Sequence, residues 1–236
     1  MLKAVIFDLD GTIISEDHIK DGLKYTFQRN KKYLQNTSFT EFLAANNRAV
    51  QRITGMRKDG LIKLNQVGIR IWFSIFNELK LPLGAEAVYQ MYKDLQNYIL
   101  SNIKLNPGFI PLIKYLKRKS IKIGILSNGL FVERFERAKK VKILKYIDVL
   151  VSSDMFGIEK PDIKIFLNIS QLLGVSPTTS VYVGNDIHQD IEGAKSSGMT
   201  PVLLVNSADN NQLKSKPFQT VNNFSDLKIL LEKLIL

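Results

Sequence analysis

The order of apolar and polar positions divides the chain into three stretches. Residues 2–9 form an almost unbroken apolar run after Lys3, which predicts a buried β-strand. From residue 16 to about residue 105, apolar residues recur three and four positions apart, a pattern typical of amphipathic helices. It predicts four helices, at residues 22–34, 39–53, 61–79 and 85–100. Four consecutive helices indicate a helical bundle.

The third stretch begins after the turn residues Asn106, Pro107 and Gly108, and it alternates helices with strands. We predict helices at residues 109–119, 131–139, 163–173 and 191–197, and strands at residues 121–126, 147–151, 180–183 and 201–205. The tail, residues 221–236, predicts a short strand or turn and a final helix. This alternation favours an α/β fold with a parallel sheet covered on both faces. We expect a core domain of residues 1–15 and 106–236, with an inserted helical cap domain of residues 16–105.

Length and composition narrow the class of protein. A chain of 236 residues is long enough for one core with a sizeable insertion. It contains no cysteine, which excludes disulfides and thiolate ligands, so any metal must bind oxygen or nitrogen. No apolar run approaches the roughly 20 residues that span a bilayer, and the N-terminus opens directly into the first strand. We expect a cytoplasmic protein with no membrane segment.

The net charge of +11 raises the question of a nucleic-acid partner. The excess is spread along the chain, and the two densest basic runs, at residues 114–122 and 137–145, alternate cations with apolar residues at near-helical spacing. No aromatic stacking platform accompanies them, which favours solvated helix faces over a nucleic-acid patch. We expect a general attraction for anionic small molecules, and keep a basic nucleic-acid-binding module without catalysis as the alternative of a different class.

Polar side chains gather directly after the predicted strands. In open α/β sheets, ligands bind at the carboxyl ends of the strands, so these residues are candidates for chemistry. They are Asp8, Asp10, Gly11 and Thr12 after the first strand, Ser127, Asn128 and Gly129 after the second, Lys160 before the helix at residues 163–173, and Gly184, Asn185, Asp186 and Asp190 after the strand at residues 180–183.

These residue types suit phosphoryl chemistry. Several carboxylates at one sheet edge repel unless a cation lies among them, and hard oxygen ligands favour magnesium. An aspartate beside phosphorus can attack it and form an aspartyl-phosphate, while a second acid protonates the leaving oxygen and later activates water. Asp8 and Asp10 suit these roles, because alternation along the strand predicts that both point to the same side. Lys160, Thr12 and Ser127 can hold the phosphate oxygens.

The four groups resemble, in order, the motifs of the haloacid dehalogenase superfamily. They read DLDGT at residues 8–12, SNG at residues 127–129, KP at Lys160 and GNDIHQD at residues 184–190. From residue 1 to about residue 199, the chain is similar to phosphatases of this superfamily that carry a helical, C1-type cap. The resemblance implies a Rossmann-like core, bound Mg²⁺, Asp8 as nucleophile and Asp10 as general acid and base. It also implies a set of phosphate contacts, namely Thr12, Ser127, Asn128 and Lys160.

The fourth motif departs from the family pattern, which commonly has an acid directly after the glycine. Here Asn185 follows Gly184, and Asp186 comes one position later. Either Asn185 binds the metal through its amide oxygen, or a one-residue shift brings Asp186 to the metal with Asp190 in support. We favour Asp186 as the ligand beside Asp8 and Asp10, because an anionic oxygen binds magnesium better than an amide oxygen does.

We therefore expect a magnesium-dependent phosphatase that hydrolyses a small soluble phosphomonoester through an aspartyl-phosphate intermediate. A phosphotransferase or phosphomutase of the same fold is the second hypothesis, since it would keep both carboxylates and the cap. A dehalogenase ranks third, because it has no need of Asp10. The expected partner is a small phosphorylated metabolite. The sequence leaves open its identity and whether the chain is a monomer or a homodimer.

Overall fold

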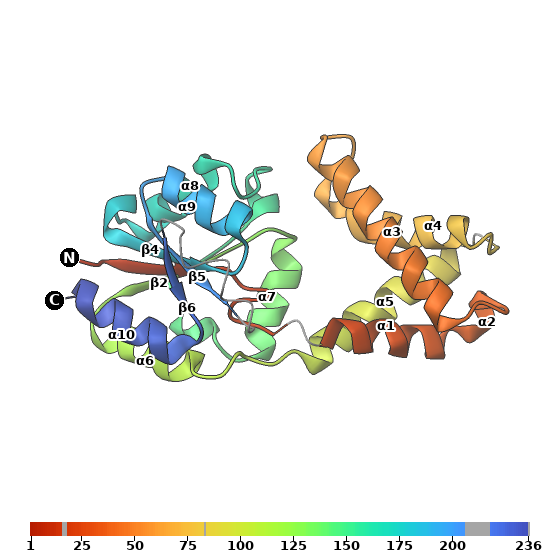
Figure 1. The fold of residues 1–236 in the computed structure, drawn as a ribbon, viewed down its shortest axis with the longest axis horizontal. Coiled ribbons are helices and arrows are strands. Elements are labelled where there is room, and N and C mark those ends of the chain that lie inside the picture. Colours follow the sequence, from red (N-terminus) through yellow and green to blue (C-terminus); the bar gives the residue numbers. More distant parts are fainter. Residues whose placement is uncertain (16–17, 83, 206–217, 236) are drawn as a thin grey trace. The chain divides into compact units, whose positions relative to one another are not determined.

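The structure, a computed structural model, describes residues 1–15, 18–82, 84–205 and 218–235 (Figure 1). The chain divides into two compact units, one formed by Met1–Glu16 with Lys104–Leu236 and the other by Asp17–Ile103. Within the described ranges, no helix combines the length and the apolar character needed to cross a membrane.

The first unit is built on a six-stranded sheet with the order β3-β2-β1-β4-β5-β6. All neighbouring strands are parallel, as the alternating pattern predicts. The strands are β1 (Ala4–Phe7), β2 (Lys122–Ser127), β3 (Val149–Ser152), β4 (Ser180–Gly184), β5 (Thr200–Leu204) and β6 (Gln219–Val221). Because β1 lies between β2 and β4, the end of the first strand is adjacent to the ends of two strands from much later in the chain.

Helices cover both faces of this sheet (Figure 1). They are α6 (Phe109–Arg118), α7 (Phe131–Lys140), α8 (Ile163–Leu173), α9 (Gly193–Ser196) and α10 (Phe224–Ile235), with short helical turns η1 (Leu144–Tyr146), η2 (Ser153–Met155) and η3 (Pro177–Thr179). Successive side chains of β1 point to opposite faces of the sheet. On one face, Ile6 belongs to the buried cluster that contains Phe166 of α8. Phe7 instead packs edge-to-face against Phe109 of α6, at 5.4 Å between ring centroids, and lies 6.3 Å from Phe224 of α10.

Two predicted elements of this unit differ from the structure. The first strand ends at Phe7 instead of residue 9, so Asp8 and Asp10 lie in the turn beyond it. The predicted helix at residues 191–197 is preceded by a π-helical turn, η4 (Ile187–Glu192), and only its continuation is α9. Asp186 begins η4, because its carboxylate accepts a hydrogen bond from the backbone N–H of Gln189 at 2.7 Å.

The second unit consists of helices packed around one apolar core. They are α1 (His18–Arg29), α2 (Lys31–Leu34), α3 (Phe39–Lys58), α4 (Leu64–Glu78) and α5 (Ala85–Asn102). The helical spacing of Trp72, Phe73 and Phe76 predicts that all three lie in this core. Trp72 and Phe76 are buried in it, but Phe73 is 38% exposed. Ser38 starts α3 with a capping box, in which its hydroxyl and the Glu41 side chain each accept the other's backbone N–H.

The helix predicted at residues 22–34 is divided into α1 and α2 at Asn30. The buried side chain of Asn30 donates to the backbone carbonyl of Thr26 at 3.0 Å and to Oδ2 of Asp94, on α5, at 2.8 Å. The second bond joins residues 64 positions apart, so the periodicity of residues 22–34 alone carries no sign of the break.

Candidate active site

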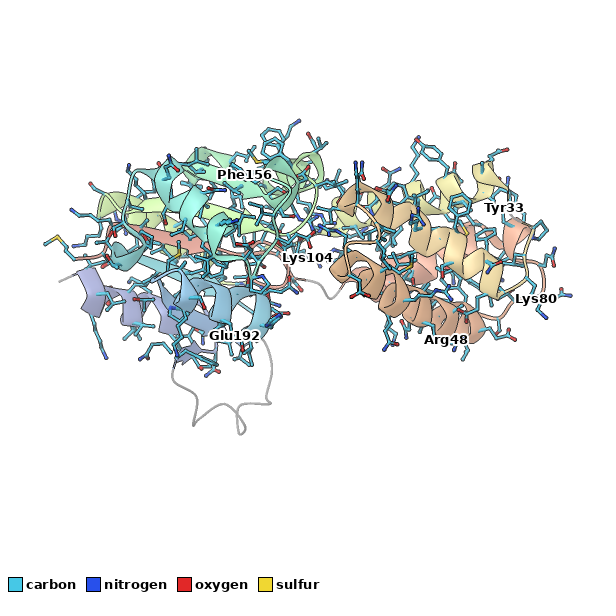
Figure 2. All side chains as sticks on the ribbon, turned by 90° about the horizontal axis from the view of Figure 1, so that it is seen from above. Tyr33, Arg48, Lys80, Lys104, Phe156 and Glu192 are labelled. Atoms are coloured by element: carbon cyan, nitrogen blue, oxygen red, sulfur yellow. The ribbon has the colours of Figure 1, made fainter. Side chains whose placement is uncertain are left out.

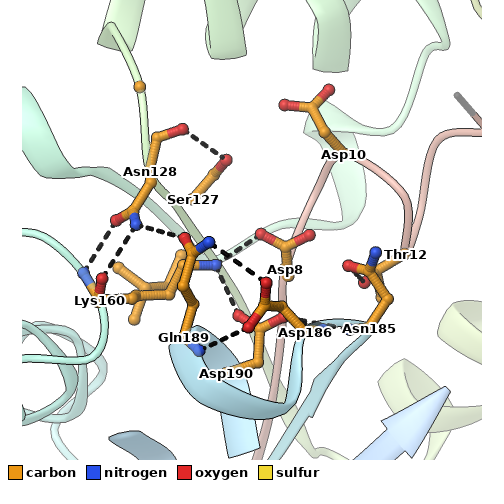
Figure 3. Close-up of polar contacts among 12 residues, drawn as sticks. Asp8, Asp10, Thr12, Ser127, Asn128, Lys160, Asn185, Asp186, Gln189 and Asp190 are labelled. Carbon is orange, nitrogen blue, oxygen red and sulfur yellow. Dashed lines mark hydrogen bonds and ion pairs between the residues drawn. The ribbon is translucent and has the colours of Figure 1, made fainter. Parts of the chain in front are cut away.

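The candidate residues gather at the carboxyl ends of three neighbouring strands (Figure 3). Asp8 directly follows β1, Ser127 is the last residue of β2, and Asn185 directly follows β4. Lys160 reaches the same edge from the segment before α8. The parallel register therefore brings the four sequence motifs together, as the sequence predicts.

Lys160 is the centre of a buried polar cluster. Its ammonium donates to Oδ1 of Asp8 at 2.6 Å, to Oδ1 of Asp190 at 2.7 Å and to the hydroxyl of Tyr182 at 3.1 Å. The hydroxyl of Tyr182 also lies 3.1 Å from the Asp190 carboxylate and 3.1 Å from the carbonyl oxygen of Leu126. The three N–H groups of Lys160 thus have three acceptors, which fixes the ammonium beside Asp8.

Burial dominates the electrostatics of this cluster. It raises the pKa of Asp8 to about 7, although Lys160 acts to lower it. Burial opposes the charged form of Lys160 too, but Asp8 and Asp190 outweigh it and hold the pKa of the lysine above its ordinary value. Burial, followed by the charge of Asp190, raises the pKa of Tyr182 well above 10.0 and keeps its hydroxyl neutral.

Asp10 points away from this cluster (Figure 3). Strand alternation does not apply to Asp8 and Asp10, because the strand ends at Phe7, although Leu9 between them is buried as expected. Two arginines of α7 pair with Asp10: Nη1 of Arg137 lies 2.5 Å from Oδ1, and Nε of Arg134 lies 3.0 Å from Oδ2. Burial acts to raise the pKa of Asp10, but the two guanidinium groups prevail and lower it.

The predicted phosphate-binding side chains all lie at this edge of the sheet and already hold protein partners. The amide of Asn128 accepts from the backbone N–H of Lys160 at 2.9 Å and donates to the carbonyl of Lys160 at 3.1 Å. Ser127 Oγ accepts from Nε of Arg134 at 3.1 Å, and Thr12 Oγ1 donates to Oδ1 of Asn185 at 3.1 Å. Asn128 therefore fixes the backbone that carries Lys160, and direct contact with phosphate stays a prediction for all of these side chains.

Asp190 shapes the loop after β4. Its Oδ2 accepts the backbone N–H groups of Asn185 at 3.1 Å and of Asp186 at 3.0 Å. A side chain on Gly184 would collide with the carboxylate of Asp190, so the loop requires glycine there. Asp186 is held by Gln189, whose backbone N–H and side-chain amide donate to it. The choice between Asn185 and Asp186 as metal ligand stays open.

The donor chemistry of this edge fits a hard divalent cation. Asp8 binds Lys160 through Oδ1 and directs its second oxygen away from the lysine (Figure 3). Asn185 and Asp186, which also carry oxygen ligands, come directly after the adjacent strand β4. A cation bound between these residues and Asp8 would favour the charged form of Asp8, which burial disfavours. Within the described ranges, no three His, Cys, Asp or Glu residues form a group that could hold a metal ion. The ligand trio Asp8, Asp10 and Asp186 therefore stays a prediction.

Sequence reasoning missed four residues that organise the site. Arg134 and Arg137 lie three positions apart on the helix that follows the second motif, and this spacing is a signal for one helical face. Gln189 lies inside the fourth motif, and its Oε1 accepts from Asn128 at 2.8 Å. Tyr182 reads as an ordinary core residue of a buried strand, and no signal in the sequence distinguishes its hydroxyl.

Two aspartates with fixed cationic partners at the carboxyl edge of a parallel sheet supply the groups that nucleophilic and acid–base catalysis require. The chain matches the haloacid dehalogenase-like hydrolases over residues 2–198, and it belongs to that family.

Curated relatives and solved structures agree with this assignment. Over 211 residues, 86% of this chain and 84% of the relative, the chain is 28% identical to a glyceraldehyde 3-phosphate phosphatase of Methanopyrus kandleri. It is 26% identical over 204 residues, 86% and 85% of the two chains, to a phosphorylated carbohydrates phosphatase of Thermotoga maritima. Its fold matches the HAD-hydrolase YfnB of Bacillus subtilis, solved bound to magnesium, with a TM-score of 0.77, 16% identity and 98% of each chain covered.

Proposed function

We propose that this hydrolase is a magnesium-dependent phosphatase that uses Asp8 to remove phosphate from a small phosphorylated carbohydrate. The observation that carries the proposal is the buried contact of 2.6 Å between Lys160 and Asp8 at the end of the central strand. The ammonium fixes one oxygen of Asp8 and leaves the other directed away from it (Figure 3). It also places a positive charge where phosphate oxygens would develop negative charge.

In the proposed first step, the free oxygen of Asp8 attacks phosphorus in line with the ester oxygen. A new bond forms between phosphorus and Asp8, the ester P–O bond breaks, and Asp10 gives a proton to the departing alcohol oxygen. Because the two arginines lower the pKa of Asp10, this step uses the minor, protonated form of its carboxyl group. The product is an aspartyl-phosphate on Asp8.

In the second step, Asp10 takes a proton from a water molecule, whose oxygen attacks the same phosphorus. The bond between phosphorus and Asp8 breaks, inorganic phosphate leaves, and both carboxyl groups return to their starting states. Bound Mg²⁺ would be held by Asp8 together with Asn185 or Asp186, and would supply charge stabilisation for the phosphate oxygens.

The substrate class follows from the relatives and from charge. Of the two relatives described above, one is named a glyceraldehyde 3-phosphate phosphatase and the other a phosphorylated carbohydrates phosphatase. The net charge of +11 also favours anionic substrates. We place a phosphorylated sugar or triose ahead of a nucleic acid, and the family assignment favours catalysis over a binding module without chemistry.

A phosphate-release assay tests the proposal. The purified protein is incubated with Mg²⁺ and a panel of sugar phosphates, triose phosphates, nucleotides and phosphoglycolate, and inorganic phosphate is measured. Release from sugar or triose phosphates is expected, with Asp8→Asn inactive on the same panel. Equal release by Asp8→Asn would contradict the nucleophile, and transfer of phosphate to a second sugar without release would establish a mutase.

A further inference from the structure

The carboxylate of Asp10 lies between two guanidinium groups, and only one of its two oxygens accepts a hydrogen bond within the described ranges. Oδ1 accepts a hydrogen bond from Nη1 of Arg137 at 2.5 Å. Oδ2 lies 3.0 Å from Nε of Arg134, yet it is a buried oxygen that accepts no hydrogen bond from the described residues. The reason is geometric, since the Nε–H of Arg134 donates to Ser127 Oγ.

Arg134 is itself anchored by the second motif. Besides the bond to Ser127, its Nη2 donates to the carbonyl oxygen of Asn128 at 2.6 Å. Gly129 makes room for the guanidinium, because a side chain there would collide with Arg134, and its φ of 144° favours glycine. The side chain of Arg134 is only 13% exposed, so its charge lies in a fixed, largely buried position.

Arg137 lies one helical turn further along α7, and its side chain is 15% exposed. Helix α7 thus provides two cations for one carboxylate. The side chain of Asp10 cannot rotate without breaking its ion pairs with Arg134 and Arg137. A carboxylate that exchanges a proton with substrate needs a fixed orientation. The two ion pairs provide it.

We infer that Arg134 and Arg137 are positioning residues that orient Asp10. This inference rests on the proposed function, because it requires Asp10 to be the general acid and base. It assigns the two arginines to Asp10, and not to the phosphate.

The test separates proton transfer from substrate binding by varying the leaving group. The kcat/KM of Arg137→Gln is measured with an alkyl phosphate, whose alcohol must be protonated as it leaves, and with p-nitrophenyl phosphate, whose phenolate leaves without a proton. The value for the alkyl phosphate should fall about 100-fold, as for loss of general acid catalysis, and that for the aryl phosphate about threefold or less. Arg137→Lys, which keeps the charge, should restore part of the loss.

Lys140→Gln is the matched control, since it removes one cation from an exposed position of the same helix and should leave both values unchanged. A double-mutant cycle completes the test. In an Asp10→Asn background, Arg137→Gln should change kcat/KM about twofold or less, because its target is gone.

Equal losses with both substrates, or a loss that persists in Asp10→Asn, would overturn the inference and show that Arg137 contacts substrate or supports the fold. Failure of the proposed function has a different result. In that case Asp10→Asn or Asp8→Asn would retain full turnover of the alkyl phosphate, whatever the arginine variants do.

Discussion

Each compact unit buries a carboxylate in a polar cluster, and the two clusters differ in how completely the oxygens are bound. In the helical unit, Asp94 receives Asn30 and the partly exposed Arg29 on Oδ2, and Gln90 on Oδ1 at 2.9 Å. In the α/β unit, the carboxylate of Asp8 accepts a hydrogen bond from Lys160 on Oδ1. Within the described ranges, its Oδ2 accepts none.

The difference separates a carboxylate that joins helices from one that we propose to be reactive. Neutral amide donors occupy both oxygens of Asp94, and its one charged partner, Arg29, is 58% exposed. This satisfied group joins α5 to the junction of α1 and α2. Asp8 is buried with a charged partner and an oxygen to spare, and its pKa is raised to about 7. Perturbed carboxylates of this kind gather at functional sites. Figure 2 draws the described side chains of both units.

Replacing Asp8 should have the largest effect on activity. Asp8→Asn keeps the shape of the side chain and removes the nucleophile, so kcat should fall about 10⁴-fold or more. Phosphate release and far-UV circular dichroism should be measured together. The spectrum should remain that of the unsubstituted protein. A variant that keeps one tenth of the activity would exclude Asp8 as nucleophile.

Removing divalent cations should have the next largest effect. With a chelator in excess, phosphate release should fall about 100-fold or more, because the charge stabilisation of the phosphate oxygens is lost. Added Mg²⁺ should restore it, and other hard divalent ions should restore part of it. Undiminished release in the chelator would contradict a metal site, and the chelator added with saturating Mg²⁺ is the control.

Replacing the buried Lys160 tests how much its ion pairs contribute to the stability of the α/β unit. Lys160→Met leaves Asp8 and Asp190 without their shared partner, and the free energy of unfolding should fall by about 3–5 kcal/mol. Lys117→Met is the matched control, because Lys117 pairs with Asp148 at 2.8 Å while its side chain is 39% exposed. Its loss should be about 1 kcal/mol or less. Urea denaturation measures both, and equal losses would remove the distinction between the pairs.

The smallest effect is expected in the helical unit. Asp94→Ala leaves the buried amides of Asn30 and Gln90 without an acceptor, which should cost about 1–3 kcal/mol of unfolding free energy. Asp59→Ala truncates an exposed aspartate of the same unit and should change it by about 0.5 kcal/mol or less. If the two variants unfold at the same urea concentration, the Asp94 cluster does not hold these helices together.

Much of the architecture could be predicted from sequence because it depends on local pattern. The alternation of strands and helices predicts the parallel sheet, and the ordered motifs predict that Asp8, Lys160 and the loop after Gly184 meet at one edge. Family membership, inferred from those motifs, is confirmed.

What could not be predicted depends on contacts between distant residues. The break at Asn30 requires Asp94, and the orientation of Asp10 requires two arginines more than 120 positions away, as the separation of 127 between Asp10 and Arg137 shows. The end of β1 at Phe7 was also not predicted, because the apolar pattern continues to Leu9, which is buried beyond the strand.

The central place of β1 in the sheet bears on how the newly made chain folds. Ala4 leaves the ribosome well before its pairing partners, Lys122 and Ser180, are made. The apolar strand Ala4–Phe7 must therefore wait without its neighbours, a state prone to misassociation. The helices of Asp17–Ile103 contact one another over short sequence distances and can pack during this delay. We expect truncated chains that end before β4 to contain a folded helical unit and to aggregate through the unpaired first strand.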